Sequence, residues 1–176
     1  PGLGTDSWAE QMAAAAAVEK RMVVDADALN LLATHPAYMS AYYDRWILTP
    51  HPGEAARLLG VTTEDIQANR FSAVRSLQQS YGGVIVLKGA GTLIANEDDI
   101  YISEYGNPGM GSGGMGDVLS GVLVGLLAQG LSLTEAARLG VCVHSAAADS
   151  AAMHGGEIGL LATDLLPHIR QLLNQH

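Results

Sequence analysis

The first half of the chain alternates short apolar runs with amphipathic stretches, as proteins that alternate strands and helices do. Apolar runs at 21–25, 46–49 and 84–88 predict three buried strands, and 93–95 with 100–102 predict a strand pair around a polar turn. Amphipathic stretches predict helices over 12–20, 28–33 and 54–59, and a fourth from Thr62 to the glycines at 82 and 83. This repetition favours an α/β fold with a mostly parallel sheet.

The second half predicts helices alone. After a glycine-rich segment, Gly106 to Gly116, helical stretches are expected over 117–129, 133–154 and 162–174. Ser132 and Glu135 have the spacing of a capping box for the second of them. Because charged residues are sparse between 117 and 154, these helices are expected to pack against the sheet and against each other. No shift in composition marks a boundary, so we expect one domain over residues 1–176.

Composition narrows the class of protein. Hydrophobic residues make up 48% of the chain, and charged residues 15%, which excludes a disordered chain. The formal charge of −9 argues against nucleic acid or an anionic membrane as the main partner. A single cysteine, Cys142, excludes an internal disulfide, and we expect it to be buried. This cysteine usage fits a reducing compartment, so we expect a cytoplasmic protein. The start of the sequence shows no signal-peptide pattern.

The strongest chemical signal is the segment Gly111-Ser112-Gly113-Gly114-Met115-Gly116-Asp117, which leads into a helix. Glycines let the backbone approach a ligand closely and turn several N–H groups toward one point. The N-terminus of the following helix would add its dipole, so the segment predicts an anion site suited to phosphate. The alternative is a glycine-rich connection with Asp117 as an ordinary helix cap.

Two other phosphate-binding patterns fail on their context. Gly111, Gly113 and Gly116 match the dinucleotide-binding fingerprint, but only helix follows, where that motif needs a second strand and a later acidic residue. The chain also lacks the Walker motif with its lysine.

Three further polar segments follow predicted strands, at the edge where open α/β sheets bind ligands. Lys88-Gly89-Ala90-Gly91-Thr92 could reach a phosphate through the ammonium group, or be a hairpin turn with a solvated lysine. His51 and Glu54 lie in a loop fixed by two prolines, where Glu54 could equally be a plain helix N-terminal residue. Asp27 is expected to cap a helix, whereas the role of Asp25 stays open.

The lone histidines give no metal signal. His144 and His154 lie in an alanine-rich stretch at no metal-ligand spacing, and we expect core or surface positions for them.

Together the segments VVDADALN, ILTPHPGEAARLLG, VIVLKGAGT and NPGMGSGGMGDVLSGVL resemble, in this order, the nucleotide-dependent NAD(P)H-hydrate dehydratases of the ribokinase-like superfamily. The resemblance runs from Pro1 to about Leu166 and implies a three-layer ribokinase-like fold with a mostly parallel sheet flanked by helices. It implies a metabolite-repair enzyme, a carbon–oxygen lyase. The hydroxyl of hydrated NADH or NADPH would be phosphorylated by ADP or ATP, with Mg²⁺ on the nucleotide phosphates, and phosphate would then leave.

The resemblance also implies roles for individual residues. Asp117 would be the catalytic base and would contact the substrate, together with Gly4 and His51. The nucleotide would lie against Lys88, Gly89, Ala90, Gly91, Thr92 and Gly116, and the transferring phosphoryl group against the amides of Gly113, Gly114, Met115 and Gly116. No dedicated set of metal ligands can be identified.

Domains of this family are longer, and the chain begins inside a loop that contains Gly2 and Gly4. We therefore expect further N-terminal strands of the sheet outside this sequence. The resemblance implies a homo-oligomer, and many bacterial relatives carry an epimerase domain upstream. Two other functions stay open: a ribokinase-like kinase for a vitamin precursor or a sugar, and a catalytically silent nucleotide-binding module.

Overall fold

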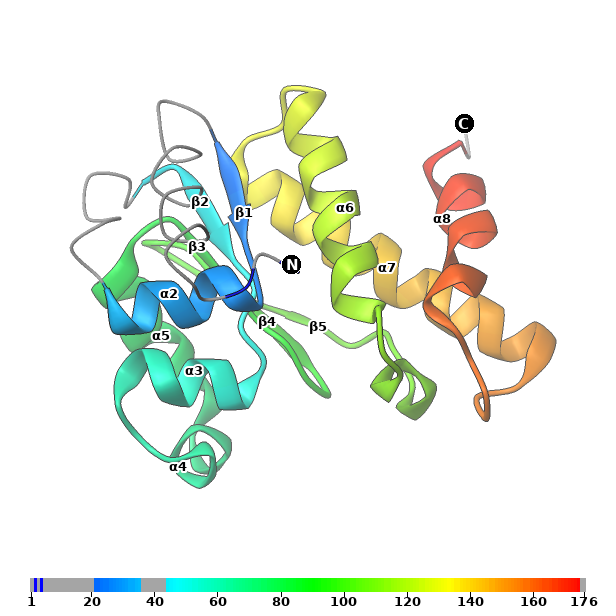
Figure 1. Cartoon of the computed structure of the whole chain (residues 1–176). Coiled ribbons are helices and arrows are strands. Elements are labelled where there is room, and N and C mark those ends of the chain that lie inside the picture. The colour runs from blue at the N-terminus through cyan, green and yellow to red at the C-terminus, as the bar shows by residue number, and fades with distance from the viewer. Residues whose placement is uncertain (1, 3, 5–20, 36–43, 175–176) are drawn as a thin grey trace. The chain divides into compact units, whose positions relative to one another are not determined.

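The computed structural model describes residues 2, 4, 21–35 and 44–174 (Figure 1). The helix predicted over 12–20 lies outside these residues. The chain divides into two compact units, each described below by itself. The first comprises residues 1–89 and 93–102, and the second comprises 90–92 and 103–176.

The sheet has five strands in chain order: β1 (Met22–Val24), β2 (Trp46–Leu48), β3 (Val84–Leu87), β4 (Thr92–Ala95) and β5 (Ile100–Ser103). The first three strands are parallel, with Leu48 opposite both Val24 and Ile85. Strand β4 runs antiparallel to β3, since Val86 faces Ile94 across a hairpin. The predicted α/β class and mostly parallel sheet are confirmed, and the hairpin makes the sheet mixed.

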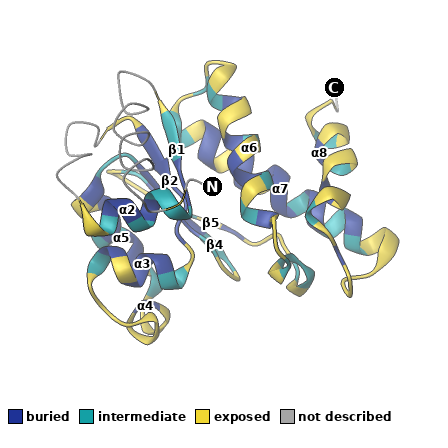
Figure 2. Cartoon of the chain, viewed as in Figure 1, coloured by how far each residue is buried: buried dark blue, intermediate teal, exposed yellow. Residues whose placement is uncertain are grey.

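Among its described residues, the first unit has four helices: α2 (Asp27–Thr34), α3 (Pro52–Leu59), α4 (Thr63–Ala68) and α5 (Arg70–Tyr81). Their apolar residues form one core with alternate strand residues, among them Trp46, Leu48 and Ile85. Figure 2 shows the buried parts of these helices and strands in dark blue. Trp46 is fully buried, and its indole Nε1 donates a hydrogen bond of 2.9 Å to the carbonyl of Tyr81. All residues of β2 and β3 are buried, as expected for parallel strands inside a sheet.

The single helix predicted from Thr62 to Gly82 is wrong, because the structure has two helices there. The break lies at Asn69, with φ −150°, whose side chain accepts a hydrogen bond from the amide of Ser72 and so caps α5. The start at Thr62 is confirmed as a capping box with Asp65. Hydrogen bonds from the Thr62 hydroxyl and amide hold the pKa of Asp65 below its usual value.

The prediction that Asp27 caps α2 is also wrong. The helix begins at Asp27 itself, and its N-cap is Ala26, with φ +49° and no side-chain cap bond. The carboxylate of Asp27 instead accepts a hydrogen bond of 2.9 Å from the amide of Gly4. Asp27 therefore ties the start of α2 to a residue 23 positions earlier in the chain.

The second unit consists of the 3₁₀ helix η3 (Pro108–Gly111), α6 (Met115–Ala128), α7 (Leu133–Gly155), the 3₁₀ helix η4 (Ala162–Asp164) and α8 (Leu165–Leu173). Helix α7 packs against α6 and against α8, and the capping box of Ser132 and Glu135 at its start is confirmed. The core between these helices includes Met115, Ala147 and Leu165. The three predicted helices are thus confirmed, with a 3₁₀ turn at the start of the last.

The predicted burial of Cys142 is wrong, because its side chain is exposed on α7. Its neighbours Val141 and Val143 are buried, and the 100° step between successive helical residues turns the position between them outward. His144 is buried, whereas the ring of His154 lies at the surface, with Nδ1 2.7 Å from the carbonyl oxygen of Ser150. In the part of the chain that is described, no helix is long and apolar enough to cross a membrane.

Candidate functional site

Three polar side chains converge at the carboxyl ends of the parallel strands in the first unit. The ammonium of Lys88, directly after β3, lies 2.9 Å from Oδ1 of Asp25, directly after β1. The same ammonium lies 3.7 Å from Oε2 of Glu54, which is in the first turn of α3, the helix that follows β2. Both carboxylates are buried, since only 3% of the Asp25 side chain and 7% of the Glu54 side chain are exposed. The half-buried ammonium of Lys88 is therefore paired with two desolvated carboxylates.

His51 forms the N-cap of α3 and is held in place by Glu54. Its Nδ1 accepts hydrogen bonds from the amides of Gly53 (3.0 Å) and Glu54 (3.4 Å), while Oε2 of Glu54 accepts one of 2.7 Å from the amide of His51. Because Nδ1 accepts, the neutral ring carries its proton on Nε2. Half of the His51 side chain is exposed. Nδ1 of the ring therefore caps the helix, while Nε2 lies 3.6 Å from Oε1 of Glu54.

Arg70 supports the backbone that follows β3. Its Nη2 donates to the carbonyl oxygens of Leu87 (3.2 Å) and Lys88 (3.4 Å). A Cβ added to Gly89, where φ is +144°, would come within 3.0 Å of that nitrogen. Burial lowers the pKa of Arg70 from its usual value. The guanidinium thus occupies the space that a side chain at Gly89 would need.

In the second unit, the glycine-rich segment ends in an N-terminus of α6 that no side chain caps. Gly114 is the N-cap residue, with φ +87°, and the first helical hydrogen bond runs from the amide of Val118 to its carbonyl. The amides of Met115, Gly116 and Asp117 therefore have no partner within the helix. This arrangement supplies the N–H groups and the dipole that an anion site requires.

Gly111 and Gly113 are not needed for the packing of this segment. Neither has a positive φ, and a Cβ on either would meet no atom within 4 Å. Asp117 is exposed in the first turn of α6. Nothing in the described structure requires glycine at 111 and 113, and both residues are exposed, so their backbone is accessible.

Comparison with known proteins decides the family. Residues 1–171 match the family described as NAD(P)H-hydrate dehydratase. The chain belongs to this family. Its predicted membership is thereby confirmed.

The curated relatives carry dehydratase and repair-enzyme names. The chain is 54% identical to the bifunctional NAD(P)H-hydrate repair enzyme Nnr of Coxiella burnetii, over 99% of this chain and 35% of that protein. It is 45% identical to the ADP-dependent (S)-NAD(P)H-hydrate dehydratase of Neisseria meningitidis, over 99% of this chain and 61% of that protein. The chain therefore spans about a third of the first relative and under two thirds of the second.

Solved structures agree on the fold. An ADP/ATP-dependent NAD(P)H-hydrate dehydratase from Bacillus subtilis, co-crystallised with ATP and Mg²⁺, superposes with a TM-score of 0.69 and 33% identity, over 73% of this chain and 47% of that one. A ribokinase-like superfamily protein from Enterococcus faecalis gives a TM-score of 0.86 and 27% identity, over 98% of this chain and 60% of that one. The ribokinase-like fold expected for this dehydratase family member is confirmed.

The structure groups the predicted site residues of this dehydratase family member by unit. In the first unit it joins Lys88 to Asp25 and Glu54, and it makes His51 and Glu54 a capping pair. In the second unit, Gly113 to Asp117 form the uncapped start of α6. Sequence reasoning missed Arg70, whose only signal is a cation at a helix start.

Two substitutions at His51 distinguish the capping role of Nδ1 from the role of the second ring nitrogen, Nε2. We expect His51→Ala to lower the free energy of unfolding by about 0.5–2 kcal/mol, because the N-cap is lost. His51→Asn should keep that stability, since an asparagine oxygen can take the place of Nδ1, while it removes Nε2. Urea denaturation of both variants checks this, and an Asn variant as unstable as the Ala variant would contradict the cap.

At Gly109, in the glycine-rich segment, any side chain is expected to destabilise the fold. A Cβ there would lie 2.6 Å from the carbonyl oxygen of Glu157 and 2.9 Å from Oδ1 of Asn107. We expect Gly109→Ala to lower the free energy of unfolding by about 1–3 kcal/mol through overpacking. Gly113→Ala is the matched control and should stay within about 0.5 kcal/mol of the wild type, since its Cβ meets open space. Equal losses in the two variants, measured by urea denaturation, would refute the expectation.

Proposed function

We propose that the chain catalyses a nucleotide-dependent dehydration, which restores NADH or NADPH from its hydrated form. The substrate is the (6S) hydrate of NAD(P)H, the donor is ADP or ATP, and the location is the cytoplasm. The observation that carries the proposal is the second-unit segment: an uncapped N-terminus of α6, two glycines with open space beside them and an exposed Asp117, within a chain of the dehydratase family.

The residues divide the chemistry between them. Asp117 accepts the proton of the ring hydroxyl as that oxygen bonds to the terminal phosphorus of the nucleotide, and the bond from phosphorus to the nucleotide oxygen breaks. The amides of Gly113, Gly114, Met115 and Gly116 hold the transferring phosphoryl group. The lone pair of the ring nitrogen then expels phosphate with its bonding electrons, and a proton leaves the neighbouring ring carbon, which restores the reduced nicotinamide.

We assign nucleotide contacts to Lys88 and Gly89 of the first unit and to Ala90, Gly91 and Thr92 of the second. Substrate contacts are assigned to His51 and Gly4 of the first unit. Nδ1 of His51 is occupied by backbone donors, so the ring would donate to the substrate through Nε2. Lys88 is already paired with Asp25, so a phosphate at its ammonium would share it with this carboxylate.

Mg²⁺ fits this arrangement as an ion carried mainly by the nucleotide. Among the described residues, no three His, Cys, Asp or Glu side chains come together in a way that could hold a metal ion. Mg²⁺ usually binds through one or two carboxylates together with substrate phosphates and water, so it needs no such group. Bound there, it would neutralise developing phosphate charge.

The experiment follows the near-ultraviolet absorbance of reduced nicotinamide, using the full native form of the chain, hydrated NADH and Mg²⁺, first with ADP and then with ATP. Recovery of absorbance that requires one nucleotide supports the dehydratase and names the donor. A stable phosphorylated product instead would indicate a ribokinase-like kinase. Bound nucleotide without turnover would indicate a silent module.

The bifunctional relatives suggest two further proposals about the whole protein. Nnr of Coxiella burnetii is named as bifunctional, and the chain covers 35% of it. We propose that an epimerase domain acts with the dehydratase in the parent protein and that the protein is a homo-oligomer. Light scattering and an epimerase assay on the full native form test both.

A further inference from the structure

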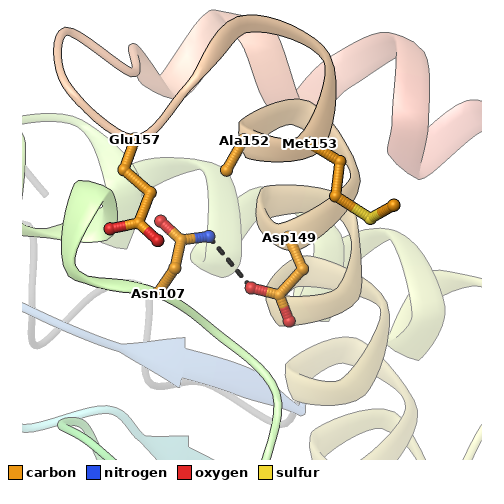
Figure 3. A pocket seen from close by; sticks show the side chains of 5 residues that line it. All are labelled: Asn107, Asp149, Ala152, Met153 and Glu157. Atoms are coloured by element: carbon orange, nitrogen blue, oxygen red, sulfur yellow. Dashed lines mark hydrogen bonds between the residues drawn. The ribbon is translucent and has the colours of Figure 1, made fainter.

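The first residues of the glycine-rich segment, Gly106 and Asn107, are hydrogen-bonded to the carboxylate of Asp149 in the middle of α7. Asp149 accepts a hydrogen bond of 2.9 Å at Oδ2 from the amide of Gly106. Its Oδ1 accepts a second one, also of 2.9 Å, from Nδ2 of Asn107 (Figure 3). Both carboxylate oxygens are thus used by donors that lie more than 40 positions earlier in the chain.

Asn107 connects Asp149 to the turn that follows, through a further hydrogen bond of its side chain. Its Oδ1 accepts a hydrogen bond of 3.0 Å from the amide of Gly109 and caps the 3₁₀ helix η3. The two ends of the Asn107 amide therefore have opposite tasks, because Nδ2 donates to Asp149 while Oδ1 accepts from the backbone. This fixes the orientation of the side chain and connects α7 to the first turn of the glycine-rich segment.

The base of this anchor is well packed. Ala147 and Ala148 are fully buried and Ala151 is 5% exposed, so α7 is held tightly around Asp149. At the last residue of η3, Gly111, and beyond it at Gly113, by contrast, an added Cβ would meet open space. A glycine-rich backbone has many accessible conformations, and a site that stabilises a transition state must be held in one of them before the reaction.

We propose that Asp149 and Asn107 are positioning residues that set the backbone of Gly111 to Gly116 for the transferring phosphoryl group. The inference rests on the proposed function. Neither residue has to touch substrate, since each acts through the hydrogen bonds at Gly106 and Gly109. Their loss should therefore lower kcat more than it raises KM for the nucleotide.

Exchanging the two side chains gives a sharp test. In Asp149→Asn one of the two donors faces an NH₂ group, and in Asn107→Asp two carboxylates face each other. The double variant Asn107→Asp with Asp149→Asn keeps the net charge and can satisfy all three hydrogen bonds with the roles reversed. Both side chains line an open pocket of about 340 Å³ with Ala152, Met153 and Glu157, so these near-isosteric exchanges do not overpack a core.

We expect each single variant to lower kcat about 10- to 100-fold, because misplacement of a site by an ångström has effects of this order. The double variant should recover to within a few-fold of the wild type. Glu135→Gln is the matched control: it also removes a carboxylate that accepts backbone and side-chain hydrogen bonds, at the other end of α7, and should leave kcat unchanged.

A second readout does not depend on turnover. In ¹H–¹⁵N spectra, the amide resonances of Gly113, Gly114 and Gly116 should shift in the single variants, return in the double variant and stay in place in Glu135→Gln. Single variants with unchanged kcat and unchanged glycine resonances would overturn the proposal, as would a folded double variant that recovers neither. Failure of the proposed function would show differently, as a wild type without turnover whose resonances still follow this pattern.

Discussion

Asp117→Asn is expected to abolish nearly all dehydration while nucleotide binding persists. Asparagine has the same size and fits the first turn of α6, but it cannot accept the proton of the substrate hydroxyl. Loss of a general base typically lowers the rate by about 10²- to 10⁴-fold. Because Asp117 is exposed and makes no cap bond, stability should hardly change. Absorbance recovery for turnover and calorimetry for nucleotide binding measure the two effects separately.

Asp65→Asn is the matched control for this variant. Asp65 is also an aspartate in the first turn of a helix, α4, and it is exposed. Its replacement should weaken a capping box without changing turnover per folded molecule. If Asp117→Asn kept wild-type turnover, Asp117 would have no part in the mechanism.

Lys88→Met is expected to produce the largest loss of stability in the first unit. It leaves Asp25 and Glu54 buried without their shared cation. Removing one partner of a buried ion pair typically lowers the free energy of unfolding by about 3–5 kcal/mol, since an uncompensated charge stays in the interior. Urea denaturation measures the loss. Arg57→Met, which removes an exposed cation of α3, should stay within about 0.5 kcal/mol of the wild type.

A double variant separates the two roles assigned to Lys88. Asp25→Asn added to Lys88→Met removes one stranded charge and should restore part of the stability. If Lys88 also contacts the nucleotide, Lys88→Met should raise KM for the nucleotide above the wild-type value. The double variant should then keep this raised KM although it is more stable. A Lys88→Met variant within 1 kcal/mol of the wild type, a small fraction of the expected loss, would show that the carboxylates are solvated once the lysine is gone.

Local signals in the sequence predicted most of the fold. The helix start at Thr62 and the capping box at Ser132 are confirmed, because each depends on a capping box between residues three apart, which needs no tertiary partner. The break at Asn69 was missed because the amphipathic pattern continues through it, although asparagine is a preferred N-cap residue. Ala26 could not be predicted as a cap, since a positive φ is rare outside glycine.

The chemistry of the site depends on partners far apart in the chain. The pattern placed Asp25 and Lys88 after separate strands, and the ends of parallel strands meet at one edge of a sheet. It could not select Asp25 as the partner, because the pair is 63 positions apart. Asp149 gave one unused signal, a lone charge within an alanine-rich stretch where its neighbours Ala147 and Ala148 are buried. Such a charge needs donors, and only the structure identifies Gly106 and Asn107.

The burial of Trp46 has a spectroscopic consequence. The chain has two tryptophans, Trp8 and Trp46, and Trp46 lies in the core of the first unit, so a change in the emission of Trp46 reports on that unit. The indole of Trp46 has no solvent exposure and donates to the carbonyl of Tyr81, so its emission should shift to the red when that core opens. Far-ultraviolet circular dichroism also detects α6, α7 and α8. Coincident denaturation curves from the two methods would mean that the units unfold together, and separate curves would give each unit its own stability.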